Sequence, residues 1–158
     1  MIKRLLFFFF ATGLVSLSAQ IVIDNNAPYN STTYLINNIL ISGGITPTNH
    51  SFIGDPMQMG FFNGVNSNLG IDSGIVLSSG NVLDLVGPNA SGSTSTGITG
   101  NSGIGGDPTL NLVVGPLDYT NDAAVLEFDF VPTSNIISFK YVFGSEEYLE
   151  FVTSFNDA

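Results

Sequence analysis

The chain has 158 residues, and its 13 acidic residues against three basic ones give a formal net charge of −10 at pH 7. This charge excludes nucleic acid as a partner, because nucleic-acid binding requires a basic surface that displaces phosphate counterions. The sequence has no Gly-Lys-Ser/Thr phosphate loop and no cysteine, which argues against a nucleotide site, a disulfide scaffold and a lipid-anchored bacterial signal. A divalent cation is the partner that such an acidic surface tolerates best.

Residues 1–19 are typical of a secretory signal peptide. Two basic residues precede an apolar run from Leu5 to Leu17, and the small pair Ser18-Ala19 closes that run. The run is shorter than the ~20 apolar residues that a membrane span needs. We therefore predict cleavage before Gln20, an exported protein that is secreted or held at the cell surface, and no transmembrane segment in this chain.

Residues 20–158 are predicted to form one domain. They number 158 − 19 = 139, which is enough for a single packed core. They keep all 13 acids and one base, Lys140, so their formal net charge is 1 − 13 = −12. Asn, Gly, Ser and Thr are plentiful and helix formers are scarce, which favours an all-β extracellular module.

The first half of this domain is predicted to hold one short helix among short strands. Apolar residues recur at helical spacing over 32–41, with Ser31 or Thr32 as the cap and Gly43-Gly44 as the stop, although 39–41 could instead begin a strand. The predicted strands cover residues 21–23, 52–53, 59–62 and 74–80. The chain's one histidine, His50, lies in the polar stretch "TNHS", which predicts a surface loop.

The second half begins with a predicted long loop and ends with two predicted strands. Residues 87–108 are rich in glycine and have few side chains that could pack. Polar and apolar residues then alternate in "AVLEFDFVP" (124–132) and again in "NIISFKYVFG" (135–144), with a turn at 132–135 between them. Two neighbouring antiparallel strands that each bury an aromatic face need a second sheet to pack against, so we predict a β-sandwich.

Several motifs together resemble the choice-of-anchor L domain family. They are "GIVLSSG", "GPN", "GDPTL" and the long stretch "NDAAVLEFDFVPTSNIISFKYVFGSEEYLEFV" with a following "FND", and the resemblance extends from about Tyr29 to the last residue. It implies a jelly-roll-like, non-catalytic module of a bacterial surface protein, joined to one of several C-terminal anchoring or sorting signals. In gliding bacteria of the Bacteroidetes type, the implied route is type IX secretion.

Two departures from the family pattern affect these expectations. Relatives continue past the Asn-Asp pair with another aromatic strand, so the resemblance implies a domain that is incomplete at its C-terminus, with anchoring through the missing region. In "GDPTL", Thr109 stands where many relatives have a further acid, which weakens a metal role for Asp107.

An acidic corner near the C-terminus is the candidate metal site. Its predicted ligands are Glu146, Glu147, Glu150, Asn156 and Asp157. Calcium takes roughly six to eight oxygen ligands, and a bound ion would add to the stability of an exported fold without disulfides. The alternative is that Ser145 caps one helical turn whose first acids are solvated and favoured by the helix dipole.

The function that we predict is adhesion or binding of an extracellular protein or glycan, without catalysis. A carbohydrate-active protein is the alternative. Tyr141 and Tyr148 could stack on a sugar in a lectin-like module, and Glu147 with Glu150 would be the carboxylate pair of a glycoside hydrolase. A Ser-His-Asp triad would have to use His50 without a nucleophile-elbow motif, so it is disfavoured.

Overall fold

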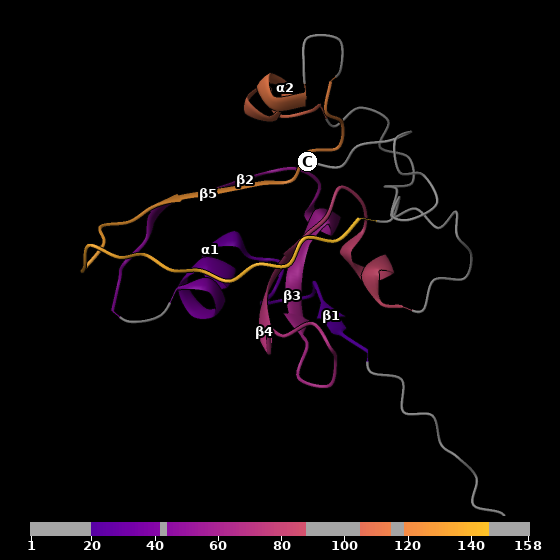
Figure 1. Cartoon of the computed structure of the whole chain (residues 1–158), viewed down its shortest axis with the longest axis horizontal. Helices are drawn as coiled ribbons and strands as arrows, with labels where there is room; N and C mark the ends of the chain where they lie inside the picture. The colour runs from indigo at the N-terminus through magenta and orange to yellow at the C-terminus, as the bar shows by residue number, and fades with distance from the viewer. Residues whose placement is uncertain (1–19, 42–43, 88–104, 115–118, 146–158) are drawn as a thin grey trace, which may run out of the picture.

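The computed structural model describes residues 20–41, 44–87, 105–114 and 119–145, in which antiparallel strands are joined by short helices (Figure 1). The elements are β1 (Val22–Asp24), α1 (Thr32–Leu35), η1 (Ile36–Leu40), β2 (Thr48–Ile53), η2 (Pro56–Gln58), β3 (Met59–Asn63), β4 (Ser73–Leu77), η3 (Val82–Leu85), α2 (Pro108–Val114) and β5 (Val125–Asp129). The predicted strands at 21–23, 52–53, 59–62, 74–80 and 124–131 each coincide with one of these strands. Among the described residues, no helix is long and apolar enough to cross a membrane.

A three-stranded antiparallel sheet in the order β1-β3-β4 forms the centre of the molecule. Phe62 lies opposite Ile23 on one side and Gly74 on the other. Position 74 has no room for a side chain, because the Phe62 ring occupies that space: a Cβ added to Gly74 would lie 2.8 Å from a ring carbon. On the same face Gly60 lies against Val82 of η3, and both Phe62 and Val82 are buried.

The predicted helix at 32–41 is confirmed, and it continues from an α-helical turn into a π-helical turn. The Ser31 hydroxyl accepts a hydrogen bond from the backbone N–H of Tyr34 at 3.3 Å, so Ser31 is the N-cap. Leu35 and Ile36 lie at the junction of α1 and η1 and are fully buried. Because α1 contacts β2 and η1 contacts β4, this helix packs against both sheets of the fold.

The second sheet consists of β2 and β5, which are separated in the sequence by residues 54–124 and pair in antiparallel fashion. The register places Phe52 opposite Leu126 and Ser51 opposite Glu127, with an irregularity near Asn49, whose φ is 52°. The pairing of β5 with residues 135–144, predicted from the turn between them, is therefore wrong. The partner of β5 comes from the first half of the chain.

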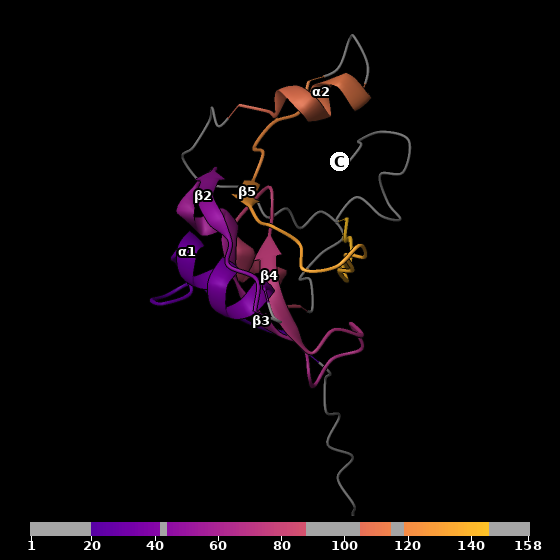
Figure 2. The same cartoon turned by 90° about the vertical axis from the view of Figure 1, so that its left-hand side faces the viewer.

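Residues 136–145 form no strand, although their alternation predicts one. The bend at 133–135 is present: the Ser134 hydroxyl accepts a hydrogen bond from the N–H of Ile136 and donates one to its carbonyl. After that bend the chain runs extended and stands apart from α1 in the second view (Figure 2). The two antiparallel sheets are confirmed, whereas their closure into a sandwich or jelly roll stays a prediction.

Candidate functional site

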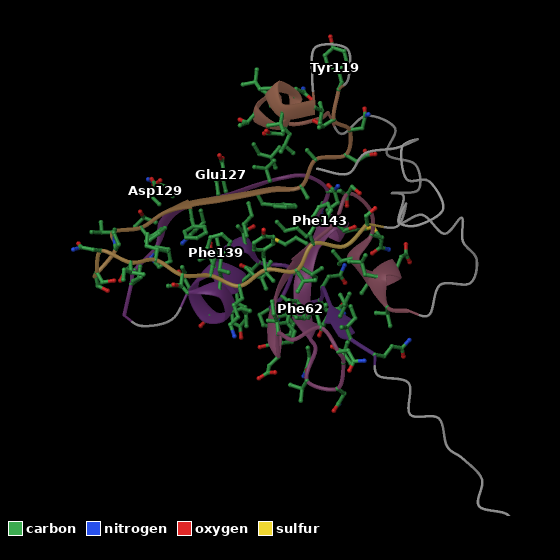
Figure 3. All side chains as sticks on the ribbon, viewed as in Figure 1. Phe62, Tyr119, Glu127, Asp129, Phe139 and Phe143 are labelled. Atoms are coloured by element: carbon green, nitrogen blue, oxygen red, sulfur yellow. The ribbon has the colours of Figure 1, made fainter. Side chains whose placement is uncertain are left out.

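The outer face of the β2–β5 sheet carries a row of polar side chains. The Asn49 amide donates a hydrogen bond to the Asp129 carboxylate at 2.6 Å, and the Ser51 hydroxyl donates one to the Glu127 carboxylate at 3.4 Å. Figure 3 shows Glu127 and Asp129 on the side of β5 opposite to Phe139 and Phe143. Both carboxylates thus hold the two strands in register, which is a structural use of an acidic pair.

His50 lies in β2, where it is half-buried, so its prediction as a surface-loop residue is wrong. Its Nε2 atom is buried and has no hydrogen-bond partner among the residues that the structure describes. The sequence prediction missed the first part of this strand at "TNHS". The bulge at Asn49 interrupts the alternation of polar and apolar residues on which that prediction depends.

Among the described residues, the longest run of exposed apolar side chains lies in residues 136–143, here called the apolar segment. The exposed fraction is 60% for Ile137, 78% for Phe139, 77% for Tyr141 and 61% for Phe143. The rings of Phe139 and Tyr141 are 5.9 Å apart and tilted by 35°. No backbone–backbone hydrogen bond joins this segment to the other described residues. It is the most conspicuous candidate for a binding surface.

Asp107 has a structural role at the start of α2. Its carboxylate oxygen Oδ1 accepts hydrogen bonds from the backbone N–H groups of Thr109 and Leu110, at 2.8 and 2.9 Å. Asp107 therefore caps the helix, Pro108 occupies its first position, and the N–H group of Asp107 donates to the Thr120 hydroxyl. The glycine-rich loop predicted over 87–108 overlaps α2 at Pro108, and its residues 88–104 lie outside the described part of the chain.

The five predicted ligands of the acidic corner, at 146, 147, 150, 156 and 157, lie outside the described residues, and so does Tyr148. Ser145, the predicted cap, is the last residue that the structure describes and is half-buried there. Within the described ranges, no three His, Asp or Glu side chains are grouped as a metal ion would need. Calcium binding and the helical-turn alternative both stay predictions.

Gln58 is a key residue that sequence reasoning missed. It is fully buried; its amide oxygen accepts from the N–H of Asp55, and its amide nitrogen donates to the carbonyls of Ser79 and Asp122. It thereby joins η2, the end of β4 and the chain entering β5. The sequence contains one signal for the local part of this arrangement, because Asp55-Pro56 followed by Gln58 is a capping-box pattern.

The fold and the site define an acidic, mostly antiparallel β module with short helices and an exposed apolar segment near its C-terminal end. The model of the choice-of-anchor L domain family matches residues 22–158, and the chain therefore belongs to that family. The membership confirms the resemblance carried by the sequence motifs and indicates an exported, cell-surface module. No curated protein and no solved structure matches the chain significantly.

Proposed function

We propose that this chain is a non-catalytic binding module that serves adhesion at the bacterial surface. The observation that carries the proposal is the family match over residues 22–158. The net charge of −12 for residues 20–158 limits the partners to proteins, glycans or cations that an acidic surface does not repel. The signal peptide and the type IX sorting route belong to the same proposal.

The described carboxylates support a structural rather than a catalytic use of acids. Asp129 and Glu127 bind side chains of the neighbouring strand, and Asp107 caps α2. Asp24 accepts from the backbone N–H and side-chain amide of Asn26, while Asp55 belongs to the capping box of η2. A catalytic carboxylate pair needs its oxygens directed at a substrate, and these oxygens are directed at the protein itself.

The test is binding and turnover measured on the same preparation of the full chain. Glycan and host-protein arrays should give a saturable ligand, and incubation with polysaccharides should release no reducing sugar. A glycan hit without turnover would favour the lectin-like form of the proposal. Turnover that is lost in Glu147→Gln and kept in Glu127→Gln would contradict the non-catalytic function and establish the hydrolase alternative.

Calcium stabilisation of the acidic corner is the second part of the proposal. Its support is the crowding of Glu146, Glu147 and Glu150, followed by Asn156 and Asp157, within 12 positions of an exported chain without cysteine. A cation at this corner would fix the chain that directly follows the apolar segment. Its test is given with the other stability predictions below.

A further inference from the structure

The apolar segment runs as an extended trace across the molecule (Figure 1) and belongs to no strand. No backbone–backbone hydrogen bond joins it to any other described residue. Ile137, Phe139, Tyr141 and Phe143 occupy alternate positions, so in a strand they would share one face. An extended backbone with unpaired N–H and C=O groups and an apolar face is the form in which a peptide adds to the edge of a sheet.

The same chain also presents an edge that could receive such a strand. In the order β1-β3-β4, the outer side of β4 has no neighbouring strand among the described residues. Ile75 and Leu77 alternate along β4 on one face, and Leu77 is 40% exposed at this edge. A strand added beside β4 would cover Leu77 and extend the sheet. Within one chain the apolar segment does not reach this edge: Figure 2 shows it separated from β4.

Charge favours a second copy of this chain as the partner. Residues 20–158 carry 13 acids and a single base, and that base, Lys140, lies in the middle of the apolar segment. The described residues from 131 to 145 contain no acid. Two copies repel each other through most of their surfaces, so a stretch that contains a base and no acid is where this repulsion is smallest. Asp72, which directly precedes β4 and is exposed, places a carboxylate at the receiving edge.

We propose that two copies of this chain form a reciprocal dimer by strand addition. The apolar segment of each copy pairs with the outer edge of β4 of the other. Because each copy both gives a segment and receives one, a two-fold arrangement closes the assembly at two chains. The interaction satisfies the backbone groups of residues 136–143 and removes their aromatic row from water.

The test is sedimentation equilibrium of the full chain, purified as released by an exporting bacterial host, over the micromolar concentration range. The wild-type chain should dimerise. Phe139→Asn with Tyr141→Asn should raise the dimer dissociation constant at least about tenfold, as loss of central aromatic anchors does. Lys140→Glu should raise it by up to about fivefold. The matched control is Leu112→Asn with Val113→Asn on α2, which changes two equally exposed apolar residues and should leave the constant within about twofold.

Three results would overturn the proposal. The first is a wild-type chain that stays monomeric throughout the range, which would mean that the segment pairs within its own chain or binds another partner such as a glycan. The second is a dimer that is insensitive to the Phe139 and Tyr141 substitutions, or equally sensitive to those on α2. The third is open-ended assembly beyond two chains. None of these results contradicts the family or the non-catalytic proposal, so the dimer can fail while the proposed function stands.

Discussion

Strand β5 and the apolar segment, 136–143, are neighbours in the sequence with the same alternating pattern, but only β5 becomes part of a sheet. β5 pairs with β2 at Val125, Leu126, Glu127 and, past the irregularity, at Asp129, and its inward side chains are half-buried. The apolar segment is longer and richer in aromatic residues, yet its side chains are exposed and its backbone is unpaired within the described part of the chain. Alternation thus sets which side chains share a face, whereas a free edge at the right place decides whether a strand forms.

The largest difference between the two regions should appear when a phenylalanine is removed from each. Phe62→Ala empties a site between Gly74 and Ile23 in the central sheet, so we expect the free energy of unfolding to fall by about 3–5 kcal/mol. Phe139→Ala, measured at a concentration where the chain is monomeric, should change it by less than about 0.5 kcal/mol. Urea denaturation gives both values. Equal losses would show that the apolar segment packs in a core.

Gln58 connects the chain entering β5 to the central body, and its removal tests that connection. Gln58→Leu leaves the N–H of Asp55 and the carbonyls of Ser79 and Asp122 without this partner, so we expect a loss of about 3 kcal/mol. Met57→Leu, at the exposed neighbouring position, is the control and should cost less than about 0.5 kcal/mol. A loss for Gln58→Leu no greater than for the control would mean that these hydrogen bonds do not hold β5 in place.

Calcium bound at the acidic corner should raise the stability of the chain, because it would fix the residues that follow the apolar segment. A ligand that binds only the native state stabilises it by about 2.7 kcal/mol at a hundredfold excess over its Kd, so the melting temperature should rise with calcium and fall with chelator. Glu147→Gln with Asp157→Asn should abolish this response.

The control for the calcium experiment is Glu127→Gln with Asp129→Asn on β5, which changes the net charge by the same amount and should keep the response. A melting temperature that does not depend on calcium would favour the solvated helical-turn interpretation of the acidic corner.

The smallest expected effect concerns α2, which Figure 1 shows standing apart from the two sheets. Asp107→Ala removes the acceptor for two N–H groups at the start of the helix and should cost about 1 kcal/mol. Asp107→Asn keeps an equivalent cap and should cost only a few tenths of a kcal/mol. Circular dichroism during urea denaturation measures both. A larger loss in the asparagine variant would indicate that the charge, rather than the cap, matters.

Local patterns predicted the local elements of this fold well. Ser31 before an apolar helical repeat gave the helix with its cap, and β-branched residues between glycines gave β4. The start of α2 was not predicted, although Asp107-Pro108 is a typical helix start. The glycine-rich residues before it favoured the prediction of a loop that extends through residue 108. His50 was missed because a bulge breaks the alternation of β2.

Long-range pairings could not be predicted from the sequence. Nothing in the pattern of β5 identifies β2, which ends at Ile53, as its partner, and the nearby alternating segment is the partner that the sequence favours. Gln58 shows the same limit, because two of its three partners come from distant parts of the chain. For the acidic corner, the residue types and spacing support calcium, while its geometry falls outside the described residues.

The central claim is that β5 pairs with the edge of β2, whereas the apolar segment has no partner strand among the described residues of the monomer. Hydrogen–deuterium exchange of individual amides, followed by NMR at a concentration where the chain is monomeric, tests it most directly. The account predicts slow exchange for the amides of β5 that bind β2, and exchange near the unprotected rate for Phe139 and Tyr141. Comparable protection of Phe139, Tyr141 and the β5 amides in the monomer would contradict the account.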